Sequence, residues 1–217
     1  MNSTPTKVST GGTPLSQSSF SPITLAESPV AGMKNKGNLT GNARVVRDNC
    51  AIICNSSKKF DELNQAGADM AMKIINLKLD ALGSSDDSCS EVLYPDGLEE
   101  LVAGLENKCD EMTALVDEMD KAKGYLIGVE KLEKFQNKGK EPIFVSWPTS
   151  KFGQFAEYVV QVFRKEMKVK MKVKEKIAHQ STKSNLMFYF TCWFYELYID
   201  RNFKEELYNM AMEVGFR

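Results

Sequence analysis

The chain has 217 residues, of which 42% are hydrophobic and 26% charged, and its formal net charge is −1. These values fit one globular domain with room for a tail. The sequence contains one histidine, His179, so a metal site built mainly on imidazoles is excluded and any Ser-His-Asp or Cys-His catalytic group depends on that residue. The near-zero charge argues against a dedicated nucleic-acid packaging protein.

The chain lacks the short motifs that usually carry catalysis. It has no glycine-rich phosphate loop, no G-x-S-x-G, no H-E-x-x-H and no EF-hand loop. No two of the five cysteines have C-x-x-C spacing. We expect the cysteines to be buried and to pack as small hydrophobic residues, with free thiols in a reducing compartment. We expect no secretory signal, no membrane span, no metal and no cofactor, and interpret His179 as a helix-capping or packing residue.

Residues 1–44 are rich in Ser, Thr, Gly, Pro and Asn and contain few large apolar residues. Such a segment buries too little surface to offset its ordering entropy, so the sequence predicts a disordered tail. Four of its residues directly precede a proline and are candidate sites for a proline-directed kinase: Thr4, Thr13, Ser21 and Ser28. A proline-rich linker in which these sites are coincidental is the alternative.

Residues 45–139 predict a long antiparallel helical hairpin of coiled-coil type. Apolar or small residues step by three and four along the first helix, expected over 47–82: Phe60, Leu63, Gly67, Met70, Ile74, Leu77 and Ala81. Every seventh residue of a second helix, expected to end near 137, is apolar: Leu105, Met112, Met119 and Leu126. Two helices leave much of this apolar stripe uncovered, so a third element or a partner must cover it.

Residues 140–217 predict a C-terminal helical unit. An extended entry over 142–148 leads into a helix expected from about 149 to 178. Its second half alternates basic and apolar residues, which is formally a strand signal, but Lys, Met and Glu favour helix and no turn residues bound the run. Shorter helices are expected over 184–198 and 202–214, which makes the whole fold all-α.

The net charge averages three regions of different sign. Residues 1–47 carry +4, residues 48–139 carry −9 and residues 140–217 carry +4. The C-terminal region includes a run of seven basic residues: Arg164, Lys165, Lys168, Lys170, Lys172, Lys174 and Lys176. They form either a solvated helix whose lysine stems cover apolar neighbours, or a contact with an acidic protein or with nucleic acid.

Seven aromatic residues fall within residues 188–198. A helix that is apolar on every side has to be covered on every side, and a chain of this size has few elements to cover it. Part of this surface is therefore expected to dock on another protein, where Trp and Tyr are favoured anchors. Packing in the core is the alternative for each of these residues.

The sequence also resembles the cyclin-dependent kinase 2-interacting protein family. Two blocks, together about half of the chain, carry the resemblance: residues 48–49, 63–67 and 75–78 in the first, and Phe144–Thr149, Phe152, 164–166, 178–179, Tyr189, Trp193 and Tyr198 in the second. The Trp-Pro-Thr element with its flanking aromatics is the most specific part. The candidate partner-binding residues are Trp147, Phe152, Tyr189, Trp193 and Tyr198.

The resemblance implies a nuclear, non-catalytic adaptor. Members of the family are associated with cyclin-dependent kinase and cyclin, with replication-origin and checkpoint proteins, and with a AAA-type ATPase assembly in replisome and ribosome maturation. In that assembly the family member pairs with a second small helical subunit. The alternative function is a nucleic-acid-binding protein that acts through the basic helix 164–176.

Overall fold

Five helices make up the part of the chain that the computed structural model describes, residues 39–83, 94–136 and 142–216. They are α1 (Gly41–Gly83), α2 (Leu98–Phe135), α3 (Thr149–Ile177), α4 (Lys183–Phe194) and α5 (Arg201–Glu213). No strand occurs among these described residues, and the predicted all-α class is confirmed.

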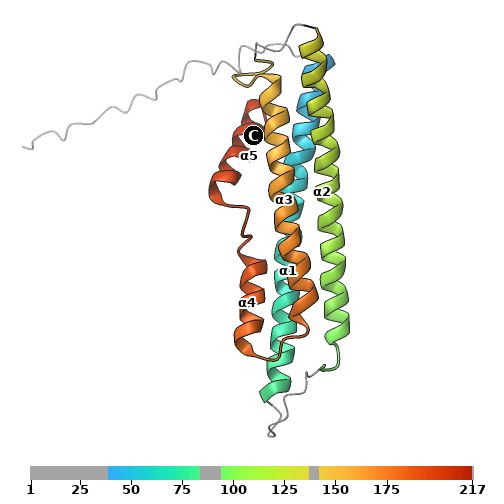
Figure 1. Ribbon diagram of the computed structural model, residues 1–217, viewed down its shortest axis with the longest axis vertical. Helices are drawn as coiled ribbons and strands as arrows, with labels where there is room; N and C mark the ends of the chain where they lie inside the picture. The colour runs from blue at the N-terminus through green and yellow to red at the C-terminus, as the bar shows by residue number, and fades with distance from the viewer. Residues whose placement is uncertain (1–38, 84–93, 137–141, 217) are drawn as a thin grey trace, which may run out of the picture. The chain divides into compact units, whose positions relative to one another are not determined.

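The three long helices lie side by side and alternate in direction, with α2 packed against both α1 and α3 (Figure 1). The predicted antiparallel hairpin of α1 and α2 is therefore confirmed, and α3 is the third element that covers it. Helices α4 and α5 follow one another along the side of the bundle away from α2, where they occupy the place of a fourth helix broken in two. Helix α4 packs against α1 and α3, and α5 packs against α1.

The predicted heptad residues fill the core between the long helices. Six of them are fully buried: Phe60, Ile74, Leu105, Met112, Met119 and Leu126. In α3 the buried residues also recur every three or four positions, which is the spacing of one helix face: Val159, Phe163, Glu166, Lys170, Val173 and Ile177. The alternating basic run is thus helical, as expected. Its alternation of basic and apolar residues does not match the burial pattern, which has the helical period.

The start of α3 is tied to the end of the chain by one carboxylate. Glu213 of α5 accepts hydrogen bonds from the backbone N–H groups of Ser146 and Trp147, the latter at 2.7 Å, and from the Ser146 hydroxyl at 2.9 Å. Burial by itself would raise the pKa of Glu213, but the N–H groups of Ser146 and Trp147 hold that pKa below its ordinary value. At the same end of the bundle, Thr149 donates to Glu133 of α2.

Two helix ends differ from the sequence-based expectation. Helix α1 begins at Gly41 instead of about 47, because Val46 enters the core and Asn42 donates to Glu133 of α2 at 3.2 Å. Residues 41–44 therefore belong to a helix and not to the tail. Helix α4 ends at Phe194 instead of 198, because Glu196 adopts a left-handed backbone conformation with φ of 45°.

Candidate protein-binding site

Three of the five residues that the sequence suggested for partner binding belong to the core. Trp193 and Phe152 are completely buried, and Trp147 is 8% exposed. Trp147 packs on Phe152 and Phe155, with ring centroids 5.1 and 5.8 Å apart. For Trp147, Phe152 and Trp193 the structure therefore favours the alternative of core packing, because rings that are covered by the chain's own helices are not exposed to a partner.

Trp193 joins α4 to the middle of α1. Its indole N–H donates to the backbone carbonyl of Asn64 at 3.0 Å. The ring lies directly over Gly67, where a Cβ atom would stand only 2.3 Å from Trp193 Cζ2. Only a glycine lets the indole approach this closely, so the glycine in the predicted heptad seam serves as the seat of Trp193.

Most of the outward-facing residues of the aromatic run lie at the break between α4 and α5, whereas Phe188, which is 61% exposed, lies in the first half of α4. Tyr195 is 69% exposed, Leu197 57% and Tyr198 46%, and they form a turn directly after α4. Phe194 precedes them, and Tyr208 of α5 is also exposed. We call these five residues the aromatic surface. Of the suggested partner-binding residues, Tyr198 belongs to it, whereas Tyr189 is half-buried against the core.

A groove of about 540 Å³ opens within this surface. It is lined by residues of the turn and of α5: Phe194, Tyr195, Glu196, Ile199, Arg201, Lys204, Glu205 and Tyr208. Its charged groups pair with one another, since Arg201 bonds Glu205 at 2.8 Å and Lys204 bonds Glu196 at 3.2 Å. Because these charges are engaged in ion pairs, the rings are the main groups that the groove offers to a partner.

Four residues of the aromatic surface were not predicted individually from the sequence: Phe194, Tyr195, Leu197 and Tyr208. Phe194 and Tyr195 belong to the aromatic run, but a helix with apolar residues on all sides gives no periodic signal for which of them are covered. Tyr208 stands among polar residues of α5, at a position where an isolated exposed tyrosine is ordinary. The sequence predicted a break between residues 198 and 202, but it does not mark the earlier end of α4 at Phe194 that leaves Tyr195 and Tyr198 in a turn.

The basic run of α3 does not form one basic surface. Lys170 is completely buried, and its place in the suggested basic patch is wrong. Arg164 pairs with Asp120 of α2 at 3.2 Å, and Lys174 pairs with Glu106 of α2 at 2.8 Å. The acidic helix α2 thus neutralises part of the run.

The remaining basic residues of the run, Lys165, Lys168, Lys172 and Lys176, are exposed. Lys172 pairs with Glu175 at 3.1 Å, and Lys165 lies 5.8 Å from the ring centre of Tyr198. Neither arrangement leaves a continuous row of unpaired cations for a phosphate backbone, so the geometry does not favour nucleic-acid binding.

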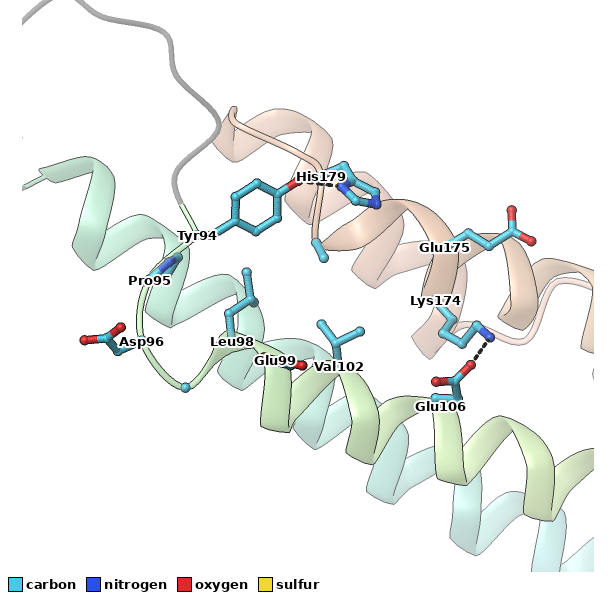
Figure 2. A pocket seen from close by; sticks show the side chains of 12 residues that line it. Tyr94, Pro95, Asp96, Leu98, Glu99, Val102, Glu106, Lys174, Glu175 and His179 are labelled. Carbon is cyan, nitrogen blue, oxygen red and sulfur yellow. Dashed lines mark hydrogen bonds and ion pairs between the residues drawn. The ribbon is translucent and has the colours of Figure 1, made fainter.

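A second groove, of about 590 Å³, lies between the beginning of α2 and the end of α3 (Figure 2). At one side the hydroxyl of Tyr94 is 2.8 Å from Nδ1 of His179, and at the other Lys174 meets Glu106. The histidine thus has a tyrosine as its hydrogen-bond partner, and Figure 2 shows it turned toward Tyr94 at the rim. This contact fits a packing role at the end of α3, as expected from the sequence.

The thiols of the four described cysteines are free, and burial disfavours the reactive thiolate in at least two of them. Cys50 and Cys109 are buried, and Cys54 and Cys192 are half-buried. Burial raises the pKa of Cys54 and of Cys109 to about 11, so both are protonated at neutral pH. Among the described residues, no group of three His, Cys, Asp or Glu side chains is placed to hold a metal ion.

Two further expectations concern the rest of the chain. The candidate phosphorylation sites Thr4, Thr13, Ser21 and Ser28 lie outside the described residues. None of the helices in the described ranges combines the length and the apolar character that a membrane crossing requires.

The fold and the site together define an all-α bundle protein with an aromatic surface at the break between α4 and α5, which take the place of a fourth helix. The chain is 30% identical to cyclin-dependent kinase 2-interacting protein of Xenopus laevis over 204 residues, which cover 88% of this chain and 98% of that protein. It is 28% identical to the protein of that name from Homo sapiens over 195 residues, covering 82% of this chain and 92% of the human protein. No protein-family model matches the chain. It belongs to the cyclin-dependent kinase 2-interacting protein family, which confirms the resemblance found in the residues.

Proposed function

We propose that this chain is a non-catalytic binding protein that engages a cyclin-dependent kinase through its aromatic surface. The names of the relatives support a kinase as the partner. The observation that carries the choice of surface is the exposed turn of Tyr195, Leu197 and Tyr198, beside Phe194 and Tyr208. Several large apolar side chains exposed within one short segment are unusual on a surface that no partner covers.

The composition of this surface suits a protein partner. Tyrosine combines a large apolar ring with a hydroxyl that remains hydrogen-bonded in a partly wet interface, and it is enriched among the residues that dominate binding energy. The side chains of Tyr195 and Tyr208 line the same groove, so one inserted side chain of the partner contacts both. The ion pairs of Arg201 with Glu205 and of Lys204 with Glu196 form a polar rim.

The proposal of a non-catalytic role rests on the state of the groups that usually react. His179 is engaged by Tyr94, and the pKa values of the thiols of Cys54 and Cys109 are raised by burial. These groups lie apart on different helices and converge on neither groove as a nucleophile with its base.

Direct binding of the purified full chain to cyclin-dependent kinase 2, with and without cyclin, tests the proposal. The variant Tyr195→Ala/Leu197→Ala is expected to bind roughly 30-fold more weakly, which is the effect of losing one hot spot of about 2 kcal/mol. A matched control is Tyr125→Ala/Phe135→Ala, which removes two exposed aromatic residues from α2 and should leave affinity unchanged. Equal affinity of all three chains, or loss in the control alone, would contradict the assignment of this surface.

The wider role implied by the family resemblance belongs to the same proposal. It comprises a nuclear location, contacts with replication-origin and checkpoint proteins, and membership of a AAA-type ATPase assembly with a second small helical subunit. Exposed Tyr125, Leu132 and Phe135 on the outer face of α2 support room for more than one partner. Affinity purification with mass spectrometry of the full chain, and of a chain starting at residue 39, tests these partners and shows whether residues 1–38 contribute. Imaging of a tagged chain tests the nuclear location.

A further inference from the structure

Helix α3 buries an ion pair in its interior face. The side chains of Glu166 and Lys170 are both completely inaccessible to solvent, and their charged atoms are 2.9 Å apart. These residues lie one turn apart on the helix, at positions where the heptad pattern of α3 otherwise places apolar side chains such as Phe163 and Val173. Removing two charges from water is costly, so a buried ion pair at core positions calls for interactions that offset this cost or for a structural role.

The further bonds of the pair go to the backbone on either side of the exposed turn. Lys170 donates to the carbonyl of Trp193, the residue before Phe194. Glu166 accepts from the backbone N–H of Tyr198 at 3.0 Å. The two charges therefore hold the first and the last residue of the segment 193–198, and the side chains between these anchors include the exposed Phe194, Tyr195 and Leu197.

Stability alone does not explain this arrangement. Replacing a buried ion pair by apolar residues of similar volume is often neutral or stabilising, so such a pair is weak support for stability. Burial lowers the pKa of Lys170, and the carboxylate of Glu166 raises it again. Part of the attraction between the two charges is therefore used to offset the cost of removing them from water. What an apolar pair does not supply is a donor for the Trp193 carbonyl and an acceptor for the Tyr198 N–H.

The break in the helix makes these backbone groups important. Continuation of α4 past Phe194 would satisfy the amides of the next turn by helical hydrogen bonds, whereas the left-handed Glu196 interrupts that ladder. Glu166 supplies the acceptor that the amide of Tyr198 requires within the turn. Its bond therefore favours the broken conformation over a longer helix.

We infer that Glu166 and Lys170 are positioning residues that fix the turn 195–198 in the conformation which presents the aromatic surface to a partner. This inference rests on the proposed function for the part that concerns binding. A surface that is already ordered loses less side-chain and loop freedom on association, so a preformed turn binds more tightly than a mobile one with the same residues. The pair acts through the backbone of the turn and does not itself touch the partner.

The unmodified full chain gives the first test by amide hydrogen exchange. The amide of Tyr198 should be protected although its side chain is half-exposed, because that amide is bonded to a carboxylate inside the bundle. Exchange of the Tyr198 amide at the rate of an unfolded chain would overturn the inference, whatever the kinase experiment shows.

Two double variants give the second test, and they differ only at Glu166. In Glu166→Met/Lys170→Met both charges and the acceptor are gone, whereas Glu166→Gln/Lys170→Met keeps an oxygen that accepts from Tyr198. The first should raise Tyr198 amide exchange roughly tenfold or more, the effect of losing a bond to a charged group, and weaken kinase binding about tenfold. The second should restore only part of both, because it keeps the acceptor for the Tyr198 amide and lacks the donor for the Trp193 carbonyl. The matched control Lys172→Met/Glu175→Met alters an exposed pair on the same helix and should change neither quantity.

The outcomes separate the two proposals. If the unmodified chain does not bind the kinase, the proposed function fails, while Tyr198 amide exchange still decides whether the pair fixes the turn. If the Met/Met variant folds and both its amide exchange and its affinity match those of the unmodified chain, positioning is refuted. If it does not fold, a Gln/Met variant that folds and keeps the Tyr198 amide protected supports the inference, and one with an unprotected amide or no fold overturns it.

Discussion

The packing of Trp193 on Gly67 predicts that the substitution Gly67→Ala destabilises the protein. A Cβ at residue 67 would lie 2.3 Å from Trp193 Cζ2, 2.8 Å from Cε2 and 3.1 Å from Nε1. These atoms belong to a rigid, completely buried ring, so the clash is not relieved by rotating the far end of a flexible side chain. The ring has to shift, and its hydrogen bond to the Asn64 carbonyl shifts with it.

The magnitude follows from three opposing effects. Overpacking a well-filled core by one methyl group costs about 1–3 kcal/mol, and loss of the indole hydrogen bond costs about 1 kcal/mol more. Replacement of glycine by alanine in a helix contributes about 1 kcal/mol in the favourable direction. The expected result is therefore a net decrease of about 2 kcal/mol in the free energy of unfolding of the Gly67→Ala variant, measured by urea denaturation.

Gly124 and Gly128 of α2 provide the matched controls. A Cβ at either position meets no atom within 4 Å, so Gly124→Ala and Gly128→Ala retain the helix-propensity gain without a clash. Each is expected to raise the free energy of unfolding by about 0.5–1 kcal/mol. If Gly67→Ala stabilises the protein as these controls do, the placement of Trp193 on α1 is refuted.

Three further substitutions test the core. Trp193→Ala should lower the free energy of unfolding by about 3–5 kcal/mol in a thermal or urea melt, and a wild-type melting curve would show that the residue is not in the core. Lys170→Met should cost about 3–5 kcal/mol because it leaves the carboxylate of Glu166 buried without its cation, whereas the double variant Glu166→Met/Lys170→Met should cost less in the same assay because it leaves no buried charge. Glu213 has a folded-state pKa below its ordinary value of 4.5, so its contribution is complete above that pH and is lost as the pH falls through the folded-state pKa. Unfolding of the Glu213→Gln variant and of the unmodified chain should therefore be compared at a series of pH values. The variant should be less stable by about 1–2 kcal/mol at pH 7, and this difference should shrink below pH 4.5. A difference in stability that does not change with pH would exclude this linkage.

The long helices could be predicted from the sequence because their apolar residues recur with a helical period. Phe60 and Ile74 in α1, and Leu105 and Met112 in α2, are separated by multiples of seven residues and are all buried. Such spacing is a local property of the chain, so it is visible without knowledge of which segments meet. Helix α3 was also predictable, although its second half alternates basic and apolar residues, because Lys, Met and Glu favour helix.

The candidate site was harder to predict from the sequence because it depends on contacts between residues far apart in the chain. Lys170 is one lysine among several in a run that is otherwise mostly exposed, and its burial follows from the position of the Trp193 carbonyl. Whether Trp193 or Tyr195 is covered depends on Gly67 of α1, more than a hundred residues earlier. The break after Phe194 carries no proline or glycine signal, and the left-handed residue there is Glu196.

The break between α4 and α5 links the buried and the exposed halves of the aromatic run. Trp193 fixes the end of α4 to α1 through Gly67 and the Asn64 carbonyl, and the chain leaves the helix two residues later. A fourth helix continued through this region would keep the helical spacing and turn some of the following rings toward the bundle. Because the helix stops instead, Tyr195 and Tyr198 both face outward while the core remains closed by Trp193. The position of the break, and not the number of aromatic residues, therefore determines how much of the run after Trp193 a partner can reach.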